Sequence, residues 1–516
     1  MKEDRISNIN IYERGSGVLL HVSSLPSEFG IGDMGKAAYD FIDFLHETKQ
    51  KYWQILPMGP LGHGNSPYQS LSIYAGAYVF IDPIDLVNRD YVTDDDLNQL
   101  RNINIDGISS YEEVGLLKGE LLRKSYERFL LLDDYQKEDY LNFIYKNDYW
   151  LDNYSLYMLI KEENSNSSWY KWKKEFRFLK NIKKIKENFN KNKKEYYKFV
   201  QYIFYRQWYS LKQYANSLGI KIIGDLPIFV SADSVDVWEN QRLFQLSKYG
   251  LPKRVAGCPP DYFSKTGQLW GNVLYDWSAM KKDDYNWWKN RLSHCLEMYD
   301  VIRIDHFRGF EAYWTIPYGA KTAVNGKWEK GPNIDFFRKL SDKLGYLAVI
   351  AEDLGIITDK VKKLLHESRF PGMKVLEFAF DSPDNDYLPH KYNENCVGYT
   401  GTHDNDTVVG WYSKSSKKIQ DYCNGYFEWY LMTENPMSIN EKFIFSIWKS
   451  KCNIAIAPLQ DLCGIGSEGR MNVPSTVNDN NWRWRAKKEM FTSNLKNLIL
   501  YITEKTNRSL EESNEN

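Results

Sequence analysis

The sequence predicts an α/β protein, a (β/α)8 barrel of the TIM type with inserted subdomains, one of them helical, and with no C-terminal β-domain. Eight short segments are predicted as buried parallel strands, because each is apolar or β-branched and ends in glycine, proline or a polar residue. Most of them follow a stretch of helical periodicity. Several lie about 30 residues apart, which is the length of one β/α unit.

The predicted strands define the barrel in chain order. They are GVLLHVSS (17–24), KYWQILP (51–57), IKIIGDLP (220–227), VIRIDHF (301–307), LAVIAEDL (347–354), GMKVLEFAF (372–380), CVGYTGTHD (396–404) and NIAIAPLQD (453–461). Helical patterns precede the second, fourth and sixth strands, at 33–49, 285–299 and 359–368. Alternation of this kind favours a parallel sheet with helices on its outside.

Two intervals between strands are too long for one unit and predict insertions into a single barrel spanning 1–516. Residues 88–195 are expected to form a mostly helical subdomain, and residues 229–288 a loop-rich subdomain that walls the active site. The Lys-rich and aromatic stretch in the first insertion is interrupted by Glu and Asn, so a solvated helix face is favoured over a nucleic-acid surface.

The composition favours a neutral partner. The chain has 67 Lys and Arg against 68 Asp and Glu, which excludes a strong field for nucleic acid or an anionic membrane. Its 16% aromatic content suits stacking on sugar rings, although a coding bias explains it equally well. The six cysteines are scattered without metal-site or disulfide spacing, and no signal peptide or spanning segment is expected. These features predict a cytoplasmic protein. The sequence does not indicate an oligomeric state.

Four acidic residues stand at predicted strand ends: Asp225, Asp305, Glu352 and Asp404. Active sites of such barrels lie at the rim where the strands end. A single strand-end aspartate is usually a cap or turn residue, but four converging carboxylates repel one another and are costly for a purely structural role. Together they predict a catalytic or metal-binding site.

Arg303 favours catalysis over Mg²⁺ or Mn²⁺ binding. It lies two residues before Asp305, so strand alternation points both side chains to the same side, where the guanidinium would lower the pKa of that carboxylate. Glycoside cleavage needs one ionised carboxylate and one protonated one. Glu352 is predicted as the acid, because its apolar neighbours would raise its pKa; Asp353 beside it is the alternative.

Several long motifs resemble a known family. They are GSGVLLHVSSLPSEFGIGDMG, LPMGPLGHGNSPYQS, GDLPIFV, GQLWGNVLYDW, VIRIDHFRGFEAYW, VIAEDLGIIT, PGMKVLEFAF, YTGTHDNDT and GSEGRMNVPST. In this order, over nearly the whole chain, they resemble the 4-α-glucanotransferases called amylomaltases or disproportionating enzymes, glycoside hydrolase family 77 of the α-amylase superfamily. The strand-three motif lacks the Asn-His pair of ordinary amylases. Ala77 and Tyr78 stand where the family pattern has Asn-Pro.

The resemblance implies a role for each matching residue. Asp305 would be the nucleophile that forms a covalent glucosyl-enzyme, Glu352 the general acid/base, and Asp404 a stabiliser of the transition state. Implied substrate-binding residues are Arg303, His403, Asp225, Tyr68, Ser66 and Trp270. Tyr262, Phe263 and Trp277 are further aromatic residues expected to hold an acceptor sugar and exclude water.

The implied activity is transfer of α-1,4-glucan segments from a donor maltooligosaccharide to the 4-hydroxyl of an acceptor glucan or glucose. A retaining double displacement of this kind places the two carboxyl groups about 5 to 5.5 Å apart. The alternatives are a hydrolytic α-glucosidase or α-amylase, a metal-dependent sugar isomerase and a non-catalytic glycan-binding protein. No phosphate loop or dinucleotide fingerprint occurs, so we expect no cofactor and no metal.

Overall fold

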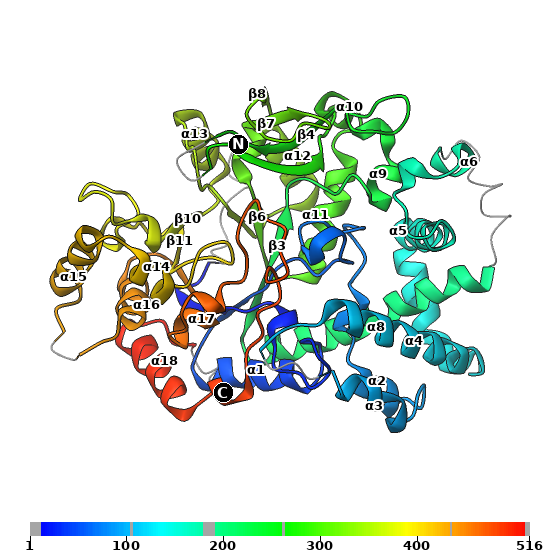
Figure 1. The fold of residues 1–516 in the computed structure, drawn as a ribbon, viewed down its shortest axis with the longest axis horizontal. Coiled ribbons are helices and arrows are strands. Elements are labelled where there is room, and N and C mark those ends of the chain that lie inside the picture. Colours follow the sequence, from blue (N-terminus) through cyan, green and yellow to red (C-terminus); the bar gives the residue numbers. More distant parts are fainter. Residues whose placement is uncertain (1–11, 104–106, 179–190, 261–263, 434–435, 511–516) are drawn as a thin grey trace.

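The computed structural model describes residues 12–103, 107–178, 191–260, 264–433 and 436–510, and in them eight parallel strands close into a barrel (Figure 1). Each strand pairs with its neighbours in chain order, and the last pairs with the first. The strands are β1 (Gly15–Leu19), β2 (Tyr52–Gln54), β3 (Lys221–Pro227), β6 (Val301–Asp305), β9 (Val349–Ala351), β10 (Gly372–Val375), β11 (Cys396–Tyr399) and β12 (Ile454–Pro458). All eight lie within or overlap the predicted segments, so the predicted barrel is confirmed.

The barrel interior is filled by one face of every strand. Because strand residues alternate between faces, Ile223, Val301, Ile350, Val397 and Ile456 pack together inside the barrel as a separate hydrophobic cluster. The charged residues of β3 and β6 follow on this same inner face, toward the strand ends. The inner face thus changes from a core to a polar site along its length.

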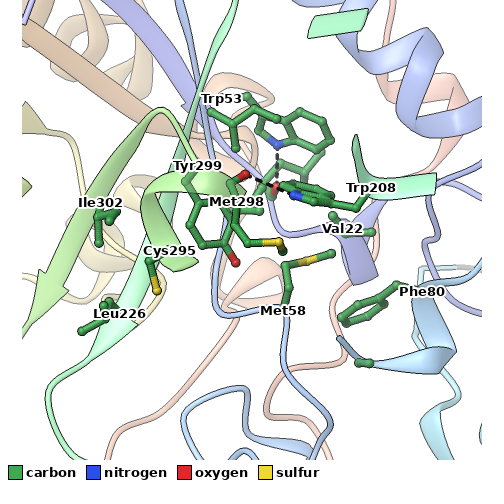
Figure 2. Packing of buried hydrophobic residues seen from close by; sticks show 14 of the residues in the cluster. Val22, Trp53, Met58, Phe80, Trp208, Leu226, Cys295, Met298, Tyr299 and Ile302 are labelled. Carbon is green, nitrogen blue, oxygen red and sulfur yellow. Dashed lines mark hydrogen bonds between the residues drawn. The ribbon is translucent and has the colours of Figure 1, made fainter. Parts of the chain in front are cut away.

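The outer face of the barrel packs against helices in a second, larger cluster. Ile302 of β6 and Trp53 of β2 belong to it, together with Trp208 and Met298 from the surrounding helices (Figure 2). The indole N–H of Trp208 donates to the carbonyl of Met298 at 3.1 Å, and that of Trp53 donates to Leu20 at 2.8 Å. Both large rings are therefore buried without an orphaned donor.

The helices around the barrel fill all but one of the intervals between strands. They are α1 (Lys36–Glu47), α8 (Lys191–Ser217), α11 (Asn286–Met298), α12 (Ile334–Leu344), α13 (Asp359–Ser368), α14 (Val408–Lys414), α15 (Lys417–Leu431), α16 (Ile439–Lys449), α17 (Leu459–Leu462) and α18 (Ser493–Lys505). Residues 376–395, between β10 and β11, contain only two 3-10 helices, Leu376–Phe378 and Pro389–Lys391. Among the described residues, no helix combines the length and the apolar character needed to cross a bilayer.

Long helices occupy most of the described part of the first insertion. α4 (Tyr111–Leu130) and α5 (Glu138–Glu163) pack with α8 on one side of the barrel, together with the shorter α2 (Pro83–Asn88), α3 (Asn98–Arg101) and α6 (Lys174–Arg177) (Figure 1). Lys118 of α4 is buried and donates to the carbonyls of Val79 and Ile81. The hydroxyl of Tyr78 donates to the carbonyl of Gly115 at 3.1 Å. Tyr78, where the chain departs from the family pattern, thus helps to hold α4 in place.

The second insertion contributes to a separate antiparallel sheet that the sequence did not predict. Its order is β5-β4-β7-β8, with β4 (Arg254–Cys258) and β5 (Gln268–Val273) from the insertion and β7 (Ala312–Pro317) and β8 (Lys327–Lys330) from the segment after β6. Two short helices, α9 (Val235–Glu239) and α10 (Trp277–Lys282), flank it in sequence. Half of this sheet therefore comes from outside 229–288.

A buried arginine joins the first and last strands of the barrel. Arg508 has no exposed surface. Its guanidinium donates to five main-chain carbonyls, at 2.6 to 3.1 Å, of Gly15, Trp448, Ser450, Cys452 and Asn453. These carbonyls belong to the start of β1 and to the turn that leads into β12. Arg508 therefore stabilises the line along which the barrel closes.

Candidate active site

Two buried charges meet on neighbouring strands at the centre of the rim. Register pairs Asp225 of β3 with Arg303 of β6, and one guanidinium nitrogen of Arg303 donates to both oxygens of Asp225 at 2.8 Å. The same nitrogen donates to Oδ1 of Asp305 at 3.2 Å. Arg303 therefore contacts Asp305, and the guanidinium holds two carboxylates at once.

The pKa of Asp305 differs from the sequence-based expectation. Burial raises this pKa well above the ordinary carboxyl range, the Arg303 guanidinium opposes the rise, and the charges of Asp225, Glu352 and Asp404 add to it. The expected lowering is therefore wrong, because burial outweighs the one guanidinium, which several nearby carboxylates share. The Asp305 side chain still exposes 30% of its surface, so a substrate can reach it.

Glu352 follows β9 directly and is held by two main-chain amides. The N–H of His306 donates to one of its oxygens at 2.6 Å, and the N–H of Leu354 donates to the other at 2.8 Å. Burial raises the pKa of Glu352, and the Arg303 charge opposes this. Asp353, the alternative considered from the sequence, instead accepts from the N–H of Met373 at 2.7 Å. Glu352 therefore lies against the residue that follows Asp305, whereas Asp353 is held at β10; the two amide hydrogen bonds also oppose the rise in the pKa of Glu352.

Tyr68 connects the buried centre to the β11 side of the rim. Its hydroxyl donates to Asp225 at 2.7 Å and lies 3.0 Å from Nε2 of His403, and the two rings stack with centroids 5.3 Å apart. Since the tyrosine proton points to Asp225, Nε2 of His403 must be the donor toward the phenol oxygen. Nε2 also lies 3.5 Å from Oδ1 of Asp404. Burial lowers the pKa of His403, although Asp404 opposes this, so the neutral ring is favoured.

Asp404 is the most open of the four carboxylates. It lies beyond the end of β11, and 46% of its side chain is exposed. Oδ1 accepts from the amide of Asn472 at 2.6 Å, and Arg470 donates to the main-chain carbonyl of Asp404 at 2.8 Å. The sequence analysis did not single out Asn472 or Arg470. The motif GSEGRMNVPST contains both, which is the one signal that could have drawn attention to them.

Trp270 contacts the site through His306, another residue that the sequence analysis missed. His306 follows Asp305 directly and adopts a left-handed backbone conformation with φ of 54°. Its ring meets the indole of Trp270 edge to face, with centroids 4.8 Å apart. Gln69 donates to the carbonyl of Trp270 at 3.1 Å, which ties β5 to the loop that carries Tyr68. The left-handed conformation of His306 depends on tertiary packing, so no local sequence pattern predicts it.

The remaining predicted residues have different surroundings. Ser66 Oγ accepts from the main-chain N–H of Tyr68 at 3.3 Å, so its side chain supports the Tyr68 loop. The ring of Trp277 packs against Trp288 and Phe336 in the hydrophobic core. Tyr262 and Phe263 lie outside the described residues. In the described ranges, no group of three or more His, Cys, Asp or Glu side chains is arranged to hold a metal ion.

The strand ends of this closed barrel bring a shared arginine, a histidine and several carboxylates to one rim. This arrangement defines the class of protein, a barrel enzyme with an acid–base site. Comparison with known proteins narrows this class. Residues 20–491 match the family described as 4-alpha-glucanotransferase, and the chain belongs to that family.

Proteins with this description are similar to the chain over almost its whole length. The 4-alpha-glucanotransferase of Clostridium butyricum is 46% identical over 94% of this chain and 99% of its own length. That of Aquifex aeolicus is 44% identical over 92% of this chain and 96% of its own length. Among solved structures, the amylomaltase from Streptococcus agalactiae in complex with acarbose aligns with a TM-score of 0.92 and 37% identity, covering 96% of this chain and 100% of that one.

Proposed function

We propose that this enzyme transfers α-1,4-glucan segments between maltooligosaccharides by a retaining double displacement. In this mechanism Asp305 is the nucleophile, Glu352 the general acid/base and Asp404 the group that stabilises the transition state. The observation that carries the assignment is the contrast between two carboxyls: Asp305 contacts a guanidinium, whereas Glu352 is buried and accepts from neutral amides. Asp305 is the more accessible of the two and can reach an anomeric carbon, and the raised pKa of the buried Glu352 suits a proton donor.

The first half-reaction cleaves the donor. A carboxylate oxygen of Asp305 forms a bond to the anomeric carbon while the bond to the glycosidic oxygen breaks, and Glu352 gives its proton to that leaving oxygen. In the second half-reaction Glu352 takes the proton of the acceptor's 4-hydroxyl, whose oxygen displaces Asp305. Each cycle returns both carboxyls to their starting states. The two carboxyl groups must therefore lie about 5 to 5.5 Å apart.

The neighbouring residues position the donor sugar in this proposal. Arg303 holds Asp305 and Asp225, and Tyr68 joins Asp225 to His403, so a sugar above them meets a rigid hydrogen-bonding surface. Ser66 supports the Tyr68 loop. Trp270 offers an aromatic face on the Glu352 side through its contact with His306, as an acceptor site needs.

Transfer requires that a bound sugar hydroxyl react faster than water, which good orientation makes possible. Incubation with maltotriose tests this. A transferase produces glucose and longer maltooligosaccharides while the total number of reducing ends stays constant. A hydrolase, the nearest alternative, increases that total, and such a result would contradict the proposed transfer.

A metal-dependent isomerase is the second alternative and is tested separately. We expect the transfer rate to be the same before and after dialysis against EDTA.

We also propose a cytoplasmic location, which rests on the scattered spacing of the six cysteines in the sequence.

A further inference from the structure

A buried carboxyl group lies next to the proposed site without belonging to it. Glu377 follows β10, and only 6% of its surface is exposed. Its Oε2 accepts from the side-chain amide of Asn405 at 3.1 Å. Its Oε1 is buried and has no hydrogen-bond partner among the residues that the structure describes. A buried acid with one orphaned oxygen is costly, so its presence calls for a reason.

Asn405 closes the turn that carries Asp404. Oδ1 of Asn405 accepts from both the main-chain N–H and the hydroxyl of Thr402, at 3.0 and 2.8 Å. The Thr402 hydroxyl oxygen in turn accepts from the main-chain N–H of Asp404 at 3.3 Å. Hydrogen bonds therefore run without a gap from Glu377, through Asn405 and Thr402, to the backbone of Asp404.

The surroundings of Glu377 keep it neutral. Burial raises its pKa well above the ordinary carboxyl range, and the charges of Asp461 and Asp406 add to this, while the hydrogen bond from Asn405 and the charge of Arg470 oppose it. In the neutral acid, Oε2 can accept from Asn405 while Oε1 carries the proton. Glu377 also packs closely against Gly401, because a Cβ atom added to that glycine would lie 2.9 Å from Oε1 of Glu377.

We propose that Glu377 is a positioning residue for Asp404, which it holds at the rim by fixing Asn405 and the turn formed by residues 402–405. This inference rests on the proposed role of Asp404. That residue lies beyond the end of its strand and is half-exposed, so the barrel sheet alone does not fix its carboxylate. Glu377 transmits the rigidity of β10 to it. Asn472 and His403 then contact the carboxylate from the other side.

The test compares E377A, E377Q and N405A by kcat, KM and melting temperature, with maltotriose as substrate. E377Q keeps a neutral acceptor oxygen for Asn405, so we expect wild-type kcat. E377A and N405A each remove one end of the link and should lower kcat on the order of 10- to 100-fold with little change in KM, the size expected for a displaced catalytic group. The double variant should be no slower than either single one, because both remove the same link.

A matched control separates positioning from general destabilisation. Asp236 is another buried acid, 2% exposed, whose pKa burial raises to about 7, and it accepts from the N–H of Ile73. D236A should lower the melting temperature as E377A does but leave kcat within about twofold, because Asp236 has no link to Asp404.

Three results would overturn the inference: wild-type kcat in E377A, equal loss of kcat in E377Q and E377A, or equal loss in E377A and D236A. D404N tells these failures apart from failure of the proposed function. If D404N is inactive and E377A is not, only the positioning role is wrong. If D404N keeps wild-type kcat, the assignment of Asp404 itself is wrong.

Discussion

Asp225 and Arg303 lie inside the barrel on paired strands and are almost completely buried, whereas Asp404 lies beyond the end of its strand and is half-exposed. The first side of the rim, which we call the strand-borne group, consists of Asp225, Arg303, Asp305 and Glu352. The second, the loop-borne group, consists of Tyr68, His403 and Asp404, together with Trp270, which β5 of the separate sheet carries. Strand register fixes the first group. The second depends on side-chain hydrogen bonds between loops that are distant in sequence.

This difference shows that strand pairing positions the proposed nucleophile, whereas contacts between loops position the binding surface. Buried charges are tolerated only where the geometry keeps them paired, and neighbouring parallel strands provide such geometry for Asp225 and Arg303. In the loop-borne group Asp404 is half-exposed, and its carboxylate is held by side-chain contacts with Asn472 and His403. Substitutions of the buried pair Asp225 and Arg303 should affect both stability and chemistry, and those in the second group mainly the reaction rate.

The largest effect is expected for D305N. Removal of the nucleophilic carboxylate should lower the transfer rate about 10⁴-fold, because no covalent intermediate forms. The amide can still accept from Arg303, so the melting temperature should change little. Initial rates of glucose release from maltotriose measure the loss. A decrease of tenfold or less would show that another residue is the nucleophile.

The next largest effect is expected for R303A, which would leave Asp225 buried without its counter-ion. Breaking a buried pair from one side costs about 3 to 5 kcal/mol of unfolding free energy. The rate should also fall, since Asp305 loses the charge that favours its ionised form. Urea unfolding and initial rates measure the two effects. R303K is the control, and it should recover part of the stability but not the contact with both carboxylates.

Y68F should have a smaller effect, confined to the rate. It removes the hydroxyl that joins Asp225 to His403, and hydrogen bonds to charged groups contribute about 1.5 to 3 kcal/mol, or roughly 10- to 100-fold in rate. Y52F is the matched control, because that hydroxyl donates to the carbonyl of Glu13 away from the rim. Equal rates for Y68F and wild type would mean that the link between the two groups has no role in turnover.

The smallest effect is a pH dependence of stability due to Glu377. Its pKa is 4.5 in the unfolded chain and higher in the folded protein, so the folded state binds more protons between these two values. The unfolding free energy must therefore fall as the pH rises through that interval. E377Q lacks this loss and should gain stability over wild type from pH 5 to pH 8 in urea unfolding. A constant difference across this range would contradict the raised pKa.

The strand-borne group could be predicted from sequence because its information is local. Asp305 ends a short apolar strand, Glu352 follows one and Asp225 lies near the end of another, and the two-residue spacing of Arg303 and Asp305 fixes their common side. Such patterns identify both the barrel and the acidic rim. The pKa of Asp305 could not be predicted in the same way, since it depends on how many carboxylates share one guanidinium.

The loop-borne group could be predicted only in part. Tyr68, Trp270 and His403 were named through the family resemblance. The contacts that Asn472 makes with Asp404, and His306 with Trp270, join segments that are tens of residues apart, and His306 has an unusual backbone conformation. The four-stranded sheet was missed for a related reason. Its strands come from two separate segments and pair through long-range hydrogen bonds, which leave no periodic pattern in either segment.

Arg508 has a consequence for how the chain acquires its structure during synthesis. Five main-chain carbonyls near β1 and β12 accept from this side chain, and Arg14 donates to three of the same carbonyls, those of Trp448, Ser450 and Cys452. While residue 508 is still inside the ribosome, these carbonyls near β1 and β12 lack the hydrogen bonds that Arg508 donates. The line along which the barrel closes therefore gains its full set of hydrogen bonds only after translation has passed this codon.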